Sequence, residues 1–298
     1  MKEFKSGFVA LVGRSNVGKS TLLNVLLNQK VSIISNKAQT TRNTIRGIYN
    51  SDEEQIIFID TPGIHKPKNK LSEYMVNIAQ KSMEDVDLIL YLIDDIKIGK
   101  GDEFILEKLK ELNTKIFVVI NKIDTMKQED INQFILQLQK YDFIQNIFPI
   151  SAINAVNTKE LLNAIKKEMP QGVMYFPSDM TVDYAERFYV SEVIREKLLL
   201  YLNDEVPHGV AVVIDSYKER KNKPILDINV TIICEKSSHK AIIIGKDGRK
   251  LKGIAKASRE ELEEFLGIKI NLQVWIKIKE NWRDNQSLML NYGYGEEI

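Results

Sequence analysis

Gly13–Ser20 reads G-R-S-N-V-G-K-S and directly follows the apolar run Phe8–Val12. The apolar run predicts a buried strand, and the residues after the loop have helical spacing. Glycines in such a loop let backbone N–H groups curl around phosphates, and the following helix directs its positive N-terminus toward them. We expect Lys19 to reach the β- and γ-phosphates and Ser20 to bind Mg²⁺. The residues predicted for this phosphate-binding loop are Gly13, Asn16, Val17, Gly18, Lys19, Ser20 and Thr21.

The composition is that of a soluble globular protein of about two domains. The 298 residues are 44% apolar and 28% charged, and 42 basic residues against 41 acidic ones give a net charge of +1. A nucleic-acid partner therefore requires a local basic patch. Cys234 is the single cysteine, so no intramolecular disulfide forms, and the three histidines lack metal-ligand spacing, so we expect no zinc site. Neither a signal peptide nor a membrane span is recognisable, which predicts a cytoplasmic protein.

Short apolar strands alternate with helical segments through residue 170, which predicts an α/β fold. We expect a P-loop three-layer sandwich with a mixed, mostly parallel sheet. The segment between Ile45–Tyr49 and Ile56–Asp60 is too short for a helical crossover, so this pair should be antiparallel. The other predicted strands are Phe8–Val12, Leu88–Asp94, Ile116–Asn121 and Ile147–Ser151, and the predicted helices are Ser20–Leu27, Leu71–Met83, Asp102–Leu112, Asp130–Lys140 and Lys159–Glu168.

A Pro- and Gly-containing linker, residues 171–181, separates this domain from a smaller α+β domain, residues 182–282. Its first helix should begin near Asp183, which forms a capping pair with Glu186. We expect a largely antiparallel sheet. The elements predicted here are strands Val210–Tyr217, Ile225–Cys234 and Lys269–Lys279, helices His239–Ile244 and Arg249–Leu266, and a loop Gly245–Gly248. The tail, residues 283–298, has no assignable regular structure.

Three further motifs follow predicted strand ends, where a parallel sheet gathers its functional side chains. In Asp60-Thr61-Pro62-Gly63, the aspartate should hold Mg²⁺ through water and the Gly63 amide should sense the γ-phosphate. In Asn121-Lys122-Ile123-Asp124, the last carboxylate accepts two guanine donors that adenine lacks, so ATP would leave it unpaired. Finally, a backbone N–H of Ser151 or Ala152 should contact the guanine oxygen. Together these motifs predict a GTP site.

The polar segment Lys37–Arg46 predicts a mobile loop that supplies a hydroxyl to Mg²⁺ when the γ-phosphate is present. Thr40, Thr41 and Thr44 are candidates, with Thr41 first and Thr40 second. The catalytic set is then Lys19, Thr41 and Gly63.

Ile64 occupies the position where Ras-like enzymes carry the glutamine that orients the attacking water. Another group must replace it, and Asn16 is a candidate for binding a monovalent cation near the phosphates. We therefore expect slow hydrolysis that depends on K⁺ or on a partner.

In the second domain, a G-x-x-G loop lies inside a basic window, residues 236–259, that contains eight lysines and arginines and one acid, Asp247. Glycines permit close approach to a nucleic-acid backbone, and the next helix offers its N-terminus to phosphate. This local excess of positive charge predicts an RNA-binding surface. The predicted contacts are Ile243, Gly245, Lys246, Gly248, Arg249, Lys250 and Lys252.

Two other functions fit the same sequence. In one, the chain is an RNA-binding module with a vestigial nucleotide site, although Lys19, Ser20, Asp60 and Asp124 are all intact. In the other, it is a regulatory GTPase whose second domain binds protein.

Over nearly its whole length the chain resembles the Era family of bacterial Ras-like GTPases, which carry a C-terminal type II KH domain and belong to the TrmE-Era-EngA-like group. The resemblance implies GTP hydrolysis coupled to binding near the 3′ end of 16S ribosomal RNA and assistance to 30S subunit assembly. It also implies a cytoplasmic protein with peripheral membrane association, and we expect a monomer. The family shares the missing glutamine. The motifs that carry the resemblance are G-R-S-N-V-G-K-S, Gln39–Arg42, Asp60–His65, N-K-I-D, I-S-A, Glu186–Lys197, Glu205–His208 and Ile243–Gly248.

Overall fold

The computed structural model describes residues 3–295, which fold as two compact units. The first comprises residues 3–67 and 72–183, and the second comprises residues 68–71 and 184–295. Residues 171–181, the predicted linker, thus group with the first unit. No helix in the described part of the chain is both long and apolar enough to span a bilayer.

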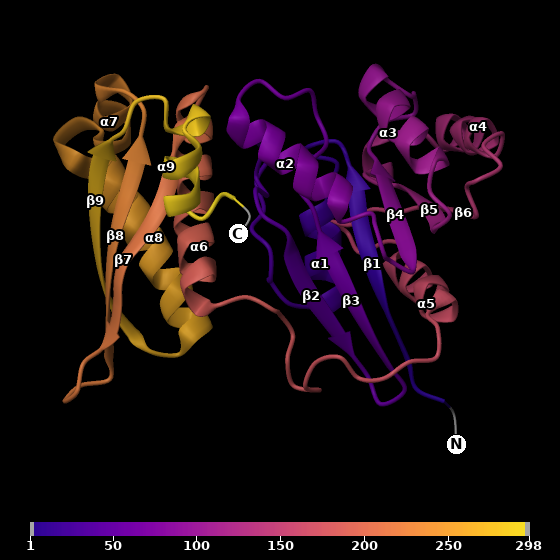
Figure 1. The fold of residues 1–298 in the computed structure, drawn as a ribbon, viewed down its shortest axis with the longest axis horizontal. Helices are drawn as coiled ribbons and strands as arrows, with labels where there is room; N and C mark the ends of the chain where they lie inside the picture. Colours follow the sequence, from indigo (N-terminus) through magenta and orange to yellow (C-terminus); the bar gives the residue numbers. More distant parts are fainter. Residues whose placement is uncertain (1–2, 296–298) are drawn as a thin grey trace. The chain divides into compact units, whose positions relative to one another are not determined.

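A six-stranded sheet in the order β2-β3-β1-β4-β5-β6 forms the centre of the first unit (Figure 1). Strand β2 runs antiparallel to β3, and the remaining neighbours are parallel, which confirms the predicted mixed, mostly parallel sheet. Every residue of β4 is buried, as expected for a strand covered on both faces. The strands are β1 (Lys5–Gly13), β2 (Ile45–Asn50), β3 (Glu54–Asp60), β4 (Leu88–Ile93), β5 (Lys115–Ile120) and β6 (Asn146–Pro149).

Helices cover both faces of this sheet, because alternate residues of each buried strand point to opposite sides. Ala10 and Val12 of β1 pack in a core cluster with apolar side chains of α2, α3 and α4, while α1 and α5 contact each other. The helices are α1 (Lys19–Leu27), α2 (Lys70–Lys81), α3 (Lys100–Lys110), α4 (Gln128–Leu138) and α5 (Thr158–Glu168). Their ends lie within two residues of the predicted ones, the usual uncertainty of a helix boundary.

The predicted linker is tied to the edge of this sheet rather than free. Gln55, which is fully buried in β3, accepts the backbone N–H groups of Tyr175 and Phe176 at 2.7 and 3.0 Å and donates to the Phe176 carbonyl at 2.8 Å. Farther along, the Ile48 N–H donates to the Thr181 carbonyl at 2.8 Å. The segment therefore covers backbone groups that an edge strand would otherwise expose.

The second unit is a three-stranded sheet, β7-β8-β9, that packs helices α6, α7 and α8 against one apolar cluster (Figure 1). Strands β7 and β8 are antiparallel, but β8 and β9 are parallel, so the predicted largely antiparallel sheet is wrong. The reason is the long helical connection, which returns the chain in the same direction. The elements are α6 (Glu186–Tyr201), β7 (Ala211–Glu219), β8 (Ile225–Cys234), α7 (Ser237–Ile244), α8 (Arg249–Leu266) and β9 (Lys269–Ile278).

Two other expectations for this unit are corrected. Helix α6 starts at Glu186 after Ala185, without a side-chain cap, and Asp183 instead forms an ion pair with Arg46 at 3.2 Å. The tail contains a short helix, α9 (Gln286–Asn291), which Asn285 caps. Six residues are too few to show a periodic pattern, which explains why the sequence did not reveal it. Cys234 is buried, as predicted.

Replacing Gln55 with alanine should lower the free energy of unfolding of the first unit by about 2–4 kcal/mol, because the substitution removes a buried amide and its hydrogen bonds to the backbone of Tyr175 and Phe176. Urea denaturation monitored by far-UV circular dichroism measures the change. Gln128→Ala, at an exposed helical glutamine, is the control and should change stability by less than about 0.5 kcal/mol. A Gln55 variant as stable as this control would show that the segment is not held here.

Candidate nucleotide-binding site

The ends of β1, β3 and β5 and the turn after β6 converge on one cavity of about 420 Å³. Carboxyl ends of parallel strands meet at one edge, which is where an open α/β sheet binds ligands. The predicted residues that line the cavity are Asn16, Gly18, Lys19, Ser20, Thr21, Thr41, Gly63, Asn121, Lys122, Asp124 and Ala152. Gly13, Val17, Asp60 and Ser151 lie behind this wall and hold it in place.

The phosphate-binding loop has a backbone that side chains at its glycines would disrupt. Gly18 has φ +97°, and a Cβ there would lie 2.2 Å from Asn121 Nδ2, so only glycine fits. Lys19 is buried, and its Nζ donates to the carbonyl oxygens of Gly13 and Arg14 at 3.2 and 2.8 Å. Burial lowers the pKa of Lys19 to about 8, while the Asp60 carboxylate and then Asp94 oppose this shift.

Oxygen ligands suited to Mg²⁺ gather beside the loop. Ser20 Oγ donates to Asp60 Oδ2 at 2.6 Å and lies 2.9 Å from Thr41 Oγ1, and Ser32 Oγ donates to the same carboxylate oxygen at 2.9 Å. Asp60 Oδ1 is buried and has no hydrogen-bond partner within residues 3–295. Burial raises the pKa of Asp60, and the hydrogen bond from Ser20 opposes the shift most. Hard hydroxyl and carboxylate oxygens fit Mg²⁺.

The three threonine candidates are placed very differently. Thr41 is buried beside Ser20 and contacts Asp60, whereas the Thr40 hydroxyl donates to the Lys37 carbonyl at 2.6 Å within its own loop. Thr44 is exposed, just before β2. The geometry therefore favours Thr41 as the Mg²⁺ ligand.

The guanine motif is joined to the phosphate-binding loop through Asn121. Its Nδ2 donates to the Val17 carbonyl at 2.8 Å, and its Oδ1 accepts the Ala152 N–H at 3.0 Å. Asp124 is exposed at the cavity wall, and Ser151 Oγ donates to its Oδ1 at 2.5 Å.

The backbone N–H groups of Ser151 and Ala152 are already used inside the protein. Ser151 donates to the Val156 carbonyl at 3.2 Å, and Ala152 donates to Asn121. A guanine oxygen would have to share the Ala152 N–H with Asn121.

Sequence reasoning missed the apolar wall of the cavity. Ile33 and Ile34 from the loop before Lys37, and Ile153 after Ala152, line it, and Ile153 is 77% exposed. An isoleucine so exposed gains a partner when a flat base covers it. The sequence could have indicated this wall, because Ile33 and Ile34 lie just before the threonine-rich loop and Ile153 directly follows Ser151-Ala152.

The side chain that follows Gly63 is that of Ile64, which cannot form a hydrogen bond with water. It is buried, and its backbone N–H donates to the Gly13 carbonyl at 3.1 Å. The neighbouring His65 bonds the Gly63 carbonyl through Nδ1 at 2.7 Å, and its Nε2 lies 3.1 Å from Gln39 Nε2. These contacts connect the segment after Asp60 with the threonine-rich loop.

In the second unit the Gly245–Gly248 loop connects α7 to α8, as predicted. Ile243 is fully buried in the core, so the prediction of a side-chain contact to RNA is wrong for this residue, because it lies on the inner face of α7. Its neighbour Ile242 is 41% exposed instead. The exposed basic residues beside the loop are Lys236, Lys246, Arg249, Lys252, Lys256 and Arg259, whereas Lys250 is half-buried.

Comparison with known proteins gives matches over both units. Residues 8–122 match the family model described as 50S ribosome-binding GTPase, and residues 205–283 match the KH domain. GTPase Era of Caldicellulosiruptor saccharolyticus is 55% identical over 293 residues, 98% of each chain, and that of Clostridioides difficile is 51% identical over 296 residues, covering 99% of this chain and 100% of the relative.

The chain belongs to the GTPase Era family.

Crystal structures of Era agree with the fold of this family member. A single-site variant of Aquifex aeolicus Era bound to GDP and AlF4⁻ is 42% identical with a TM-score of 0.95, covering 98% of this chain and 100% of that one. An Era complex with MgGDPNP and nucleotides 1506–1542 of 16S ribosomal RNA has the same identity, coverage and TM-score. As an Era-family enzyme, this chain hydrolyses GTP.

Asp124→Asn should change the base that this Era-family enzyme prefers. An amide at this position donates where the carboxylate accepted, so it mismatches the guanine amine and matches the oxygen that xanthine carries there. We expect GDP affinity to fall by about 100-fold and XDP affinity to rise, as measured by fluorescent-nucleotide competition. Asp142→Asn, at another exposed aspartate, should leave both affinities unchanged. Unchanged base preference in Asp124→Asn would remove this residue from the site.

Proposed function

We propose that this GTPase binds single-stranded RNA near the 3′ end of 16S ribosomal RNA, that its nucleotide state controls this binding, and that it thereby assists assembly of the 30S subunit. The Era complex that contains nucleotides 1506–1542 supports the choice of RNA. The observation that carries the proposal for this chain is the group of exposed basic side chains, Lys246, Arg249 and Lys252, in and after the Gly245–Gly248 loop at the start of α8.

The nucleotide half of the proposal assigns roles to residues that line one cavity. Ser20 and Thr41 would hold Mg²⁺ directly, and Asp60 through water, while Lys19 would bind the β- and γ-phosphates. The ion would neutralise charge on the phosphate oxygens. Gly63 lies against the loop, since a Cβ there would be 2.4 Å from Ser15 Cα, so its backbone is placed to respond to the γ-phosphate. Asn121, Lys122 and Asp124 would select guanine.

The RNA half rests on electrostatics and on backbone shape. Gly245 and Gly248 have φ +71° and +73°, and no atom lies within 4 Å of a Cβ built on Gly248, so the loop presents an open surface. Helix α8 begins directly after it and offers its N-terminus to phosphate. Lys246, Arg249 and Lys252 would neutralise neighbouring phosphates, and the half-buried Lys250 lies against Gly245.

A protein ligand for the second unit is the competing function. Phosphate contacts release counterions, so RNA affinity should fall steeply with salt, whereas an apolar protein interface responds weakly. A flat plot of log K against log salt concentration for the 16S oligonucleotide would favour the protein ligand.

We also propose that K⁺ contributes to hydrolysis through Asn16. This residue has φ +69°, is exposed at the cavity wall, and its carbonyl accepts from Lys122 Nζ at 2.8 Å, which holds the loop while the side chain remains available to a cation. A cation there would stabilise the charge that develops during phosphoryl transfer.

Turnover of GTP should be about tenfold faster in KCl than in NaCl, and Asn16→Ala should remove most of that difference. Phosphate release at saturating GTP measures both rates. Asn36→Ala, which changes another exposed asparagine of the cavity wall, is the control and should keep the difference. Fast and equal rates of GTP hydrolysis in the two salts, measured without a partner, would contradict the proposed role of K⁺.

The expectations of a monomer, of a cytoplasmic location and of peripheral membrane association remain part of the proposal. Membrane association rests on the family resemblance alone, and sedimentation of the chain alone and with anionic lipid vesicles tests the first expectation and the last.

Gly248→Asp should abolish binding to a 16S 3′-end oligonucleotide while leaving GDP affinity within about twofold, because it adds a negative charge on the phosphate path. Gly267→Asp is the matched control: Gly267 has φ +65°, no atom lies within 4 Å of its Cβ position, and it ends α8 far along the chain from the loop. Any backbone strain is then similar in the two variants. Equal loss of RNA binding in both would mean that strain, not charge, is responsible.

A further inference from the structure

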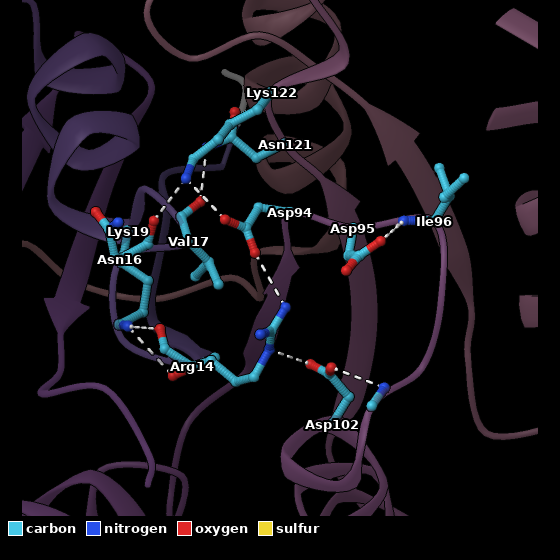
Figure 2. Close-up of polar contacts among 12 residues, drawn as sticks. Arg14, Asn16, Val17, Lys19, Asp94, Asp95, Ile96, Asp102, Asn121 and Lys122 are labelled. Carbon is cyan, nitrogen blue, oxygen red and sulfur yellow. Dashed lines mark hydrogen bonds and ion pairs between the residues drawn. The ribbon is translucent and has the colours of Figure 1, made fainter. Parts of the chain in front are cut away.

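Asp94 lies between the two ends of the nucleotide site, although no motif points to it. It directly follows β4, and the sheet order places β4 between β1, which ends in the phosphate-binding loop, and β5, which ends at Asn121. Its carboxylate therefore lies beside both loops at the carboxyl edge of the sheet (Figure 2).

Each oxygen of this carboxylate accepts from a different cation. Arg14 Nη2 donates to Asp94 Oδ1 at 3.0 Å, and Lys122 Nζ donates to Oδ2 at 2.7 Å (Figure 2). Arg14 belongs to the phosphate-binding loop and Lys122 to the guanine motif. Lys122 Nζ also donates to the Asn16 carbonyl at 2.8 Å, so the same ammonium holds the loop backbone directly.

A second carboxylate, that of Asp102, holds the guanidinium group of Arg14 in place. Arg14 Nε donates to Asp102 Oδ1 at 2.9 Å, and Asp102 is 1% exposed. Asp102 also accepts from the Tyr91 hydroxyl at 2.8 Å and from the Gly99 N–H at 3.2 Å, which anchors it to β4 and to the start of α3. Arg14 is thereby held rigidly, and its orientation presents Nη2 to Asp94.

We propose that Asp94 is a positioning residue: it neutralises Arg14 and Lys122 together and so keeps the phosphate-binding loop and the guanine motif in one arrangement. The inference rests on the proposed nucleotide site. Asp94 is 21% exposed, so solvent screens its ion pairs only partly. Without its charge, two cations would face each other across a neutral side chain, and both loops would separate more easily.

Asp94→Asn tests this, because asparagine keeps the shape and removes the charge. We expect fluorescent GDP and a fluorescent GTP analogue each to dissociate about tenfold faster from the variant than from the wild type. If the association rates are unchanged, this weakens the binding free energy by about 1.4 kcal/mol. The kcat at saturating GTP should stay within about twofold, because the residue touches no reacting atom.

Asp95→Asn is the matched control, since Asp95 is the exposed neighbour whose carboxylate accepts the Ile96 N–H at 2.7 Å (Figure 2). Its dissociation rates should equal those of the wild type. Arg14→Met serves if Asp94→Asn does not fold: it leaves the Lys122–Asp94 pair intact and should speed dissociation by about threefold. In the double variant, Arg14→Met should add little, because both changes break the same link.

Dissociation from Asp94→Asn within about twofold of that from Asp95→Asn overturns the proposal, and so does a kcat that falls as much as dissociation rises. Failure of the wild type to bind GDP in this assay would instead refute the nucleotide site itself.

Discussion

The carbonyl groups of the phosphate-binding loop impose the constraint on which this structure depends. A loop that turns its N–H groups toward phosphates turns carbonyls outward, and buried carbonyls need donors. Helix α1 and the segments after β3 and β5 supply the donors: Lys19 Nζ and Ile64 N–H reach Gly13, Lys122 Nζ reaches Asn16, and Asn121 Nδ2 reaches Val17. The motifs that we propose to bind Mg²⁺ and guanine therefore also build the loop.

This dual use explains which features could be predicted from sequence. Strands that are buried on both faces, such as Leu88–Ile93, form apolar runs that a sequence displays, and motifs at their ends mark one edge of the sheet. The position of the cavity could therefore be predicted. The Asn121 contacts depend on side-chain geometry across neighbouring strands, which no spacing along the chain encodes.

The predictions that were wrong for the second unit failed for the same reason: the features concerned depend on tertiary contacts. The parallel pairing of β8 with β9 depends on where the chain returns after α8, not on the alternation within either strand. Ile243 was among the predicted RNA contacts, although helical spacing turns its side chain into the core. Asp183 looked like a helix cap in sequence but pairs with Arg46 in the first unit. Local sequence patterns predicted where the helices and strands lie, whereas tertiary contacts determine how the strands pair and which side chains are buried.

We propose that the nucleotide cavity and the basic residues around the Gly245–Gly248 loop act in one cycle, in which the bound nucleotide sets RNA affinity. The most direct test measures the dissociation constant for a 16S 3′-end oligonucleotide with Mg²⁺ and a non-hydrolysable GTP analogue, and again with Mg²⁺ and GDP. We predict binding about tenfold tighter with the GTP analogue, and by thermodynamic linkage the RNA should tighten the analogue relative to GDP by the same factor. Equal RNA affinity in the two nucleotide states would contradict this coupling.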